Sequence, residues 1–502
     1  MYKQGPYLLH TAPVVEGATK DYRDFADLLE KVNEILVVTG LEESLINVAI
    51  KRLPKCTKKK GWFVRFRQVV TFQIRTVLLR KLIGMDYRAF SVISSDSALI
   101  QWFLRRGTLE GFGGGVLGNG LSKSALERYD KAITAEDIED AVRKLNLAVS
   151  TDKIAEKVGG LDAGLNVREL YADCTCLESN IHFPVDWVLL RDAVRTMVLA
   201  IECIRRHGMK HRIREPKLFL REINQLCIAM SASGKKKDGG KKRKKTLRAM
   251  LTVVTIVKAH VERYRRLLEQ QWQTRTDFSK AEAGQVIKRL DDILARLPAA
   301  MEQARRRILD GEKVADSKKV LSLYEPDVHV IFRGKSGAEV EFGNTLYIAE
   351  SRDGLIVDFE YCRGRAPSDA KLLEASVDRC IKAYGSIDSY TTDRGFSSPD
   401  IVKKLTTCNI DNNVLPKSPR LMAEALSDER FREAQRRRAQ TEGRIGILKN
   451  VFIRESLSGK GYAHQRLEVA WSILAHNLWV IARIALARIA EDEGLSKIPK
   501  SA

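Results

Sequence analysis

Two aspartates lie where a β-strand pattern places a carboxylate in or at the end of a sheet. Asp173 interrupts the short apolar run RELYADCTCL (168–177), and Asp393 ends the run IDSYTTD before Arg394 and Gly395. A carboxylate within an apolar strand is costly unless it is paired or binds a metal. Mg²⁺ prefers oxygen ligands and keeps several waters, so a few carboxylates from different elements can hold it. Either aspartate alone could equally be a cap or turn residue.

A third acid, Glu442, lies on a long basic helix that is predicted to start near Ser427. At 100° per residue, the side chains that fall within about 40° of Glu442 are those of Gln435, Arg438 and Lys449. Phosphodiester chemistry commonly uses two hard cations about 4 Å apart, held by acids on neighbouring strands and on a helix that crosses them. A carboxylate with arginine and lysine on the same helix face suits such a site.

Two further features single out Glu442 on this helix. Gly443 and Gly446 follow it, although each glycine costs about 1 kcal/mol in a helix interior. A solvated basic helix explains the arginines but neither the glycines nor the aligned face. Glu433 lies half a turn away from Glu442 and Glu429 faces mostly away as well, so Glu442 is the predicted third acid.

The elements that would position these acids indicate an α/β mixed fold. The strand at 168–177 is followed by helices from Pro184 to about 318, and three strands with turn signals between them begin near 327. A helix, a strand, a helix and a strand come next, then the basic helix and an apolar helix at about 462–489. This order is typical of a mixed sheet whose first strand is separated from the others by a helical insertion.

Residues 21–165 are predicted to be mostly helical, because apolar residues recur at spacings of three and four. A glycine-rich break, GFGGGVLGNG (111–120), precedes Ser122, a good N-cap for the next helix. Helix, turn and helix near 84–134 would suit docking in a DNA major groove. The side chains that would contact DNA there are those of Lys123, Ser124 and Arg128. A plain helical bundle with a polar face explains the same pattern.

The charge balance favours a polyanionic partner. The chain has 86 Lys and Arg against 64 Asp and Glu, a formal net charge of +22. Nucleic acid and an acidic membrane surface are the candidates, and nucleic acid is preferred for a charge of this size. The segment GKKKDGGKKRKK (234–245) is too charged to pack and is predicted to be a solvated loop that could lie on phosphates.

Nothing in the sequence indicates export or a membrane span. The start MYKQGPYLLH lacks an apolar h-region, and the longest apolar stretch is interrupted by His476, Asn477 and Arg483. The eight cysteines are dispersed and show no spacing typical of metal ligands. We therefore expect a cytoplasmic protein with reduced cysteines and no membrane contact.

At this point the sequence resembles the DDE transposases of bacterial insertion sequences. ADCTCLESNIHFPVDWVLL resembles the strand that carries the first Asp, and TTDRGF resembles the motif of the second. RRRAQTEGRIGILK is similar to the third motif (Arg, three residues, Glu, six residues, Lys), which is met by Arg438, Glu442 and Lys449. Where the family commonly has a Tyr three positions before the Arg, this chain has Gln435. HNLWVIARI (476–484) resembles the family's C-terminal helix.

The resemblance implies a domain organisation. An RNase H-like catalytic core would comprise residues 166–183 and 319–490, interrupted by a helical insertion at 184–318. An all-α N-terminal DNA-binding domain would comprise 1–165, and 491–502 would form a C-terminal tail. The resemblance is most distinct over about 168–490 and weaker over 70–140.

The resemblance also implies a chemistry. Asp173 and Asp393 would bridge two Mg²⁺ ions, for which Mn²⁺ can substitute, and Glu442 would complete one site. Arg438 and Lys449 would hold phosphates near the scissile bond. The substrate would be double-stranded DNA, namely the terminal inverted repeats of the element and its target. The protein would act as a homodimer or larger assembly on DNA, in the bacterial cytoplasm at the nucleoid.

Two other functions use the same features. An RNase H-like structure-specific nuclease would use the same acids to cut DNA but would not join it. A domesticated DNA-binding protein derived from a transposase would need none of the three acids, so their joint presence argues against it.

Overall fold

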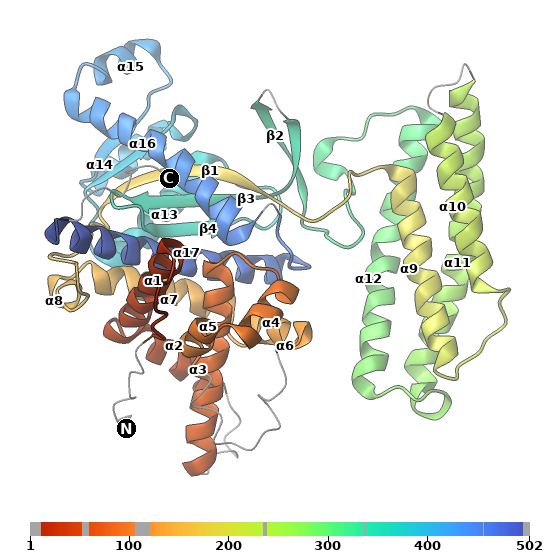
Figure 1. Cartoon of the computed structure of the whole chain (residues 1–502). Coiled ribbons are helices and arrows are strands. Elements are labelled where there is room, and N and C mark those ends of the chain that lie inside the picture. The colour runs from red at the N-terminus through yellow and green to blue at the C-terminus, as the bar shows by residue number, and fades with distance from the viewer. Residues whose placement is uncertain are drawn as a thin grey trace. The chain divides into compact units, whose positions relative to one another are not determined.

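The computed structural model describes residues 12–52, 60–105, 121–233, 238–335, 338–454 and 456–494. The chain forms two compact units (Figure 1). The first contains the described residues up to Glu178 and those from Thr345 onward, and the second is Ser179–Asn344. The glycine-rich break predicted at 111–120 lies outside the described residues.

A six-stranded mixed sheet carries the elements of the predicted core. Its strands are β1 (Glu169–Glu178), β2 (His329–Lys335), β3 (Ala338–Ser351), β4 (Ile356–Tyr361), β5 (Ser389–Thr392) and β6 (Asp411–Val414). The order is β2-β3-β1-β5-β6, and β4 also pairs with β3. β5 runs parallel to both β1 and β6, whereas β2 and β4 are antiparallel to β3. The predicted mixed sheet is therefore observed, with its first strand between the meander and the parallel strands.

The helices that follow β4 include those predicted, in the predicted order, and one short helix, α15, that was not predicted. They are α13 (Asp369–Tyr384), α14 (Pro399–Thr407), α15 (Pro419–Ala425), α16 (Glu429–Ile447) and α17 (Tyr462–Asp492). The long basic helix is α16, which packs against β1, β5 and β6. It continues as a π-helix, η7 (Leu448–Ile453), before the chain turns into α17.

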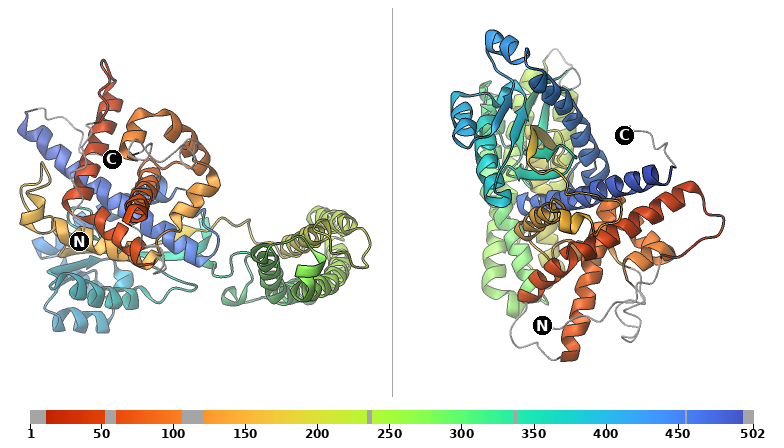
Figure 2. Two further views of the ribbon diagram at one scale, coloured as in Figure 1. Left: turned by 90° about the horizontal axis from the view of Figure 1, so that it is seen from below. Right: turned by 90° about the vertical axis from the view of Figure 1, so that its left-hand side faces the viewer.

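The N-terminal helices pack in the first unit together with the sheet. They are α1 (Lys20–Val38), α2 (Leu41–Lys51), α3 (Lys60–Leu82), α4 (Tyr87–Asp96), α5 (Ala98–Phe103), α6 (Lys123–Asp130), α7 (Ala135–Val149) and α8 (Asp152–Ala155). α17 lies between these helices and the sheet and contacts α1, α3, α7 and β4 (Figure 2). The boundary predicted after residue 165 thus falls inside one compact unit, because α17 supplies apolar surface to both sides.

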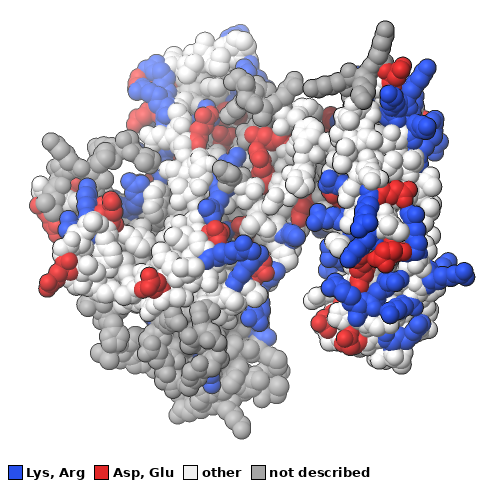
Figure 3. All heavy atoms as spheres, turned by 45° about the vertical axis from the view of Figure 1, so that its right-hand side comes forward, with Lys and Arg blue, Asp and Glu red and all other residues white. Residues whose placement is uncertain are grey.

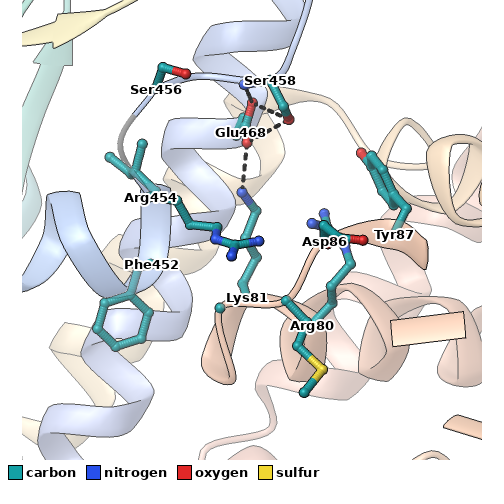
Figure 4. A pocket seen from close by; sticks show the side chains of 12 residues that line it. Arg80, Lys81, Asp86, Tyr87, Phe452, Arg454, Ser456, Ser458 and Glu468 are labelled. Atoms are coloured by element: carbon teal, nitrogen blue, oxygen red, sulfur yellow. Dashed lines mark hydrogen bonds and ion pairs between the residues drawn. The ribbon is translucent and has the colours of Figure 1, made fainter. Parts of the chain in front are cut away.

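A buried ion pair joins α3 to α17 (Figure 4). Lys81 Nζ lies 3.1 Å from Glu468 Oε1, and Glu468 also accepts hydrogen bonds from the backbone N–H groups of Ser458 and Gly459. The pair borders a cavity of about 100 Å³ where the end of α3 meets the segment after η7. Removing either partner would leave a buried charge uncompensated, so this contact helps to hold the N-terminal helices on the core.

By length and composition alone, α17 could cross a membrane, and within the described residues it is the one helix that could. Most of its apolar window is buried inside the first unit. His476 and Asn477 are fully buried within it. The Asn477 side chain donates hydrogen bonds to Asn146 Oδ1 at 2.9 Å and to the carbonyl of Ile356 at 2.8 Å. In this structure α17 is a core helix.

The second unit is a set of four long helices with its own apolar core. They are α9 (Asp186–Arg206), α10 (Pro216–Ala232), α11 (Gly239–Arg275) and α12 (Lys280–Ala304), followed by the π-helix η4 (Arg305–Asp310) and the 3-10 turn η5 (Asp316–Lys318). Helices fill most of the range 184–318, where an insertion was predicted, and the compact unit runs on through β2 into β3. The prediction of a loop at 234–245 was wrong from Gly239 onward, because α11 begins there; 234–237 lie outside the described residues.

Candidate active site

Asp173 and Asp393 are brought together by two strands that are far apart in the sequence. In the parallel pairing of β1 with β5, Tyr171 lies opposite Thr391. Continued by two residues, the same register places Asp173 opposite Asp393, where β5 has ended and Arg394 begins a 3-10 turn. Adjacent strands lie about 4.8 Å apart. We infer that the two aspartates lie side by side, Asp173 in the middle of β1 and Asp393 just beyond the end of β5.

The carboxyl group of Asp173 is only partly compensated. Its side chain is 20% exposed, and its Oδ2 lies 4.0 Å from Nη1 of Arg438. Its Oδ1 accepts a hydrogen bond from the backbone N–H of Cys174 at 2.7 Å. Burial raises the pKa of Asp173 to about 6, and the charges of Asp393 and Glu442 add to this rise, while the Cys174 N–H and Arg438 oppose it. Three acids and an arginine therefore act on one another at this end of the sheet.

Gln435 fastens α16 to the ends of β5 and β6. Its Nε2 donates hydrogen bonds to the carbonyls of Thr392, at 3.2 Å, and Asn413, at 2.7 Å. Its Oε1 accepts a hydrogen bond from Nε of Arg438 at 3.3 Å. An amide offers both donors and an acceptor, which this position uses together. Because Thr392 directly precedes Asp393, Gln435 sets the position of the helix relative to the second acid.

The opposite face of α16 is anchored on a fully buried acid, Glu350 of β3. Glu350 Oε1 accepts hydrogen bonds from Arg437 Nη1 at 3.0 Å and from Thr441 Oγ1 at 2.8 Å. Its Oε2 lies 3.5 Å from Arg444 Nε, close enough for an ion pair but without a hydrogen bond. Arg437 also lies over the ring of Tyr171, 4.7 Å from its centroid. These contacts fix the rotation of α16 about its axis.

This rotation separates the two glutamates that were compared in the sequence. Both Glu442 and Glu433 are exposed on α16. The charge of Glu442 acts on Asp173, whereas the charge of Glu433 acts on Tyr171, beneath the face that carries Arg437. Glu442 and Glu433 therefore lie on opposite sides of the helix, because nine residues at 100° each make two and a half turns.

A fourth acid, Asp369 in the first turn of α13, lies beside the pair and was not predicted. A Cβ on Gly395 would lie 3.1 Å from Asp369 Oδ2 and 3.0 Å from Asp393 Oδ1, so both carboxylates border the same small space. Burial raises the pKa of Asp369, and the charge of Asp393 adds to the rise, while a hydrogen bond with Cys174 opposes it. In the sequence Asp369 has only the signature of a helix start. The glycine two positions after Asp393 is the one local sign that something approaches closely there.

The donor atoms suit a hard divalent cation, although the side chains do not yet enclose one. Across the described ranges, no three His, Cys, Asp or Glu side chains converge tightly enough to hold a metal ion. Asp173 and Asp393 are nonetheless held in register, and each uses only Oδ1 to accept a backbone hydrogen bond. Glu442 is exposed, so its side chain can change rotamer to join them. Carboxylate oxygens in this number are what Mg²⁺ prefers.

Lys449 lies just beyond the end of α16, as the second residue of the π-helix η7. A π-helix has more residues per turn than an α-helix, so the α-helical pitch gives the direction of Lys449 only approximately, and its place on the face of Glu442 stays a prediction. It is partly exposed, and the described residues give it no hydrogen bond or ion pair. Of the two predicted phosphate-binding side chains, the structure places Arg438 but not Lys449 against the acids.

The residues predicted to contact DNA from the N-terminal part lie on α6. Lys123, Ser124 and Arg128 are all exposed there. Ser122 caps the helix as predicted, because its Oγ accepts a hydrogen bond from the backbone N–H of Ala125 at 3.2 Å. The helix is short, with eight residues. It presents a basic outer side and packs against α3 and α4 through its inner side.

Comparison with known families identifies the part of the chain that contains most of this site. Residues 346–478 match a family model described as a transposase DDE domain. The match covers the second half of β3 through most of α17 and includes Asp393, Arg438 and Glu442. Asp173 precedes it and joins the site through the pairing of β1 with β5. No curated protein and no solved structure matches the chain significantly.

Proposed function

This chain carries a transposase DDE domain, and on that premise we propose that it cleaves DNA at the ends of a mobile element and joins them to target DNA. The observation that carries the proposal is the parallel pairing of β1 with β5, whose register, continued by two residues, would set Asp173 opposite Asp393 beneath the helix that carries Glu442. A mixed sheet of this order, with acids on two neighbouring parallel strands, supports an RNase H-like core.

The acids would bind divalent metal, on which DDE transposases generally depend. Asp173 and Asp393 would share the ions, and Glu442 would complete one site. Bound Mg²⁺ would activate the attacking oxygen and stabilise the leaving oxygen at the scissile phosphate. Since burial already raises the pKa of Asp173, a nearby dication would favour its ionised form and relieve the repulsion among the acids.

The neighbouring side chains would position the DNA. Arg438 is held by Gln435 and points its guanidinium toward Asp173, where it can donate hydrogen bonds to a phosphate. In the first step water attacks phosphorus and the P–O3′ bond breaks, which frees a 3′-OH. In the second step that 3′-OH attacks a phosphate of the target and displaces another 3′ oxygen. The exposed Lys123, Ser124 and Arg128 of α6 would contact DNA away from the scissile bond.

Asp393→Asn tests the proposal. The change removes one carboxylate charge but preserves the shape of the side chain, so we expect near-normal DNA binding and no Mg²⁺-dependent nicking. The substrate is a supercoiled plasmid that contains the DNA flanking this gene, and the readout is the fraction of nicked and joined products. Nicking by the variant at the native rate would mean that Asp393 is not a ligand. Nicking without joined products by the native protein would indicate a nuclease.

A further inference from the structure

The positive charge of this chain is concentrated in the helical unit. Residues 179–344 contain 35 Lys and Arg against 20 Asp and Glu, a net charge of +15 out of the total of +22. The rest of the chain, which holds the acids of the candidate site, is twice as long and carries +7. Figure 3 shows Lys and Arg side chains spread over the surface of this unit. A unit that neither contains the acids nor needs such a charge to fold has another use for it.

The longest helix of the unit, α11, separates apolar from basic residues. Its buried stripe includes Leu247, Met250, Val254, Val257, Val261 and Tyr264. At 100° per residue, a stripe of exposed basic residues lies on the opposite side. It consists of Lys241, Lys245, Arg248, Arg263 and Arg266, and we call it the α11 basic stripe. In the described part of the chain none of the five forms an ion pair, whereas their neighbour Arg265 is paired with Glu269 and Asp291.

The start of the stripe is electrostatically unfavourable in the free protein. Lys241 and Lys245 lie in the first two turns of α11, where the helix dipole is positive, and no acid lies in the first turn. Lys242 and Lys244 are exposed there as well. Arg243 is directed inward and lies over the ring of Trp187, 5.5 Å from its centroid, which fixes this end of α11 against α9. Asp238 at the N-cap is one acid beside these four exposed lysines, so this helix end keeps an excess of positive charge that is complementary to a polyanion.

We propose that the α11 basic stripe binds the phosphate backbone of duplex DNA without reading its sequence. The choice of DNA as the polyanion rests on the proposed function. Lysines supply flexible point charges that suit phosphates, and contacts to phosphates carry no sequence information. The stripe spans 25 residues from Lys241 to Arg266, or about 37 Å of helix at 1.5 Å per residue, which exceeds one turn of duplex. The helical unit would therefore hold a stretch of duplex DNA by its phosphates.

The salt dependence of DNA binding tests this proposal in the full-length protein. The test variant is Lys241→Gln/Lys245→Gln/Arg248→Gln, since Gln preserves helix propensity. The matched control is Lys280→Gln/Lys288→Gln/Arg289→Gln, which removes three exposed charges from α12, toward the other end of the same unit. Binding to a 30-base-pair duplex of random sequence is measured by fluorescence anisotropy without Mg²⁺ over a series of KCl concentrations. Thermal unfolding followed by circular dichroism verifies that both variants are folded.

For the native protein, the logarithm of the DNA-association constant should fall linearly with the logarithm of the salt concentration. In the test variant this slope should be smaller in magnitude by about 2 to 3, because each phosphate contact contributes about 0.9 to it. The control should change the slope by less than about 1. Equal changes in both variants would show that only total charge matters and would overturn the proposal, as would an unchanged slope in the test variant. Tighter, stripe-dependent binding to vesicles containing phosphatidylserine or to single-stranded RNA would also overturn it.

This outcome is separable from that of the proposed function. If the native protein binds duplex DNA through the α11 basic stripe but does not nick it with Mg²⁺, the proposed catalytic function is wrong and the proposal that the stripe binds DNA is supported. If the native protein nicks DNA and the test variant shows the same salt dependence of DNA binding as the native protein, the catalytic function is supported and the proposal that the stripe binds DNA is wrong.

Discussion

Two acids, Glu350 and Asp173, lie under opposite faces of helix α16, and they differ in burial and in the number of side chains that compensate their charge. Glu350, under one face, is fully buried and lies within 3.5 Å of atoms of Arg437, Thr441 and Arg444. Asp173, under the other face, is 20% exposed, and its ion-pair partner Arg438 stands 4.0 Å away. Both acids come from strands of the same sheet. The difference lies in how completely the helix neutralises each of them.

We interpret the difference as that between an acid that anchors the helix and the acid that the proposed function places in the active site. Glu350 holds the helix in place through two hydrogen bonds to its Oε1 and an ion pair of its Oε2 with Arg444. Asp173 is removed from water without an equivalent partner, which raises its pKa to about 6. Such a group costs stability and persists where chemistry needs it. The same short segment of α16 supplies both environments because its residues alternate between the two faces.

The largest effect should come from the acid on the functional face of α16. Glu442→Gln removes a carboxylate that acts on Asp173, so we expect DNA cleavage to fall on the order of a thousandfold, the effect of losing a metal ligand worth several kcal/mol. Glu433→Gln, on the other face, should leave cleavage within about twofold. Nicking of plasmid DNA with Mg²⁺ measures both. Equal losses in two folded variants would mean that the faces are not functionally distinct.

On the structural face, Glu350→Gln should mainly affect stability. The change leaves Arg437 and Arg444 without their buried counter-charge, and breaking a buried pair in this way costs about 3–5 kcal/mol. Urea unfolding of the full-length protein gives the free energy of unfolding, and Glu433→Gln is again the control. A free energy of unfolding equal to that of the native protein would show that Glu350 does not anchor α16.

The pH dependence of stability should distinguish the two acids further. The pKa of Asp173 is about 6 in the folded state, above its ordinary value, so the folded state binds the extra proton. The contribution of Asp173 to stability is therefore greatest at low pH and falls as the pH rises from about 4 through 6. Asp173→Asn removes this fall and should stabilise the metal-free protein at pH 7 by up to about 3 kcal/mol. Thermal unfolding in EDTA at pH 4.5 and 7 measures the difference, and a fall of the same size in both proteins would contradict it.

The smallest effect concerns the glycines beside Glu442. A Cβ on Gly443 or Gly446 would meet no atom within 4 Å, and both residues are helical. Gly443→Ala/Gly446→Ala should therefore stabilise the protein by about 1 kcal/mol per site. If DNA approaches this side of α16 closely, cleavage should fall even though stability rises. A variant that is both more stable and fully active would show that the glycines have no role in binding DNA.

Several features of the site could be predicted from the sequence because they depend on local periodicity. The order of helices and strands after residue 327 follows from alternating patterns and turn signals. The shared face of Glu442, Arg438 and Gln435 follows from the pitch of an α-helix. The change from α16 to a π-helix at Leu448, just before Lys449, was not predicted, because no local pattern indicates it.

Other features required the tertiary structure. The loop predicted at 239–245 is helical because the packed apolar stripe of α11 extends the helix through a charged start. Asp369 lies beside Asp393 only because α13 packs next to the end of β5. The contacts of Gln435 with two carbonyls also depend on where the strands end.

The sequence by itself determined which residues could serve as the acids and which side of α16 carries the third. Only the tertiary structure decided that the strands beside Asp173 and Asp393, which are 220 positions apart, pair in parallel, because the register of two parallel strands is set by the packing of the whole sheet. It also decided that the N-terminal helices share one core with that sheet, since α17 contributes buried surface to both. Local sequence patterns determine whether a segment forms a helix or a strand, whereas contacts between distant segments determine which elements pack against each other.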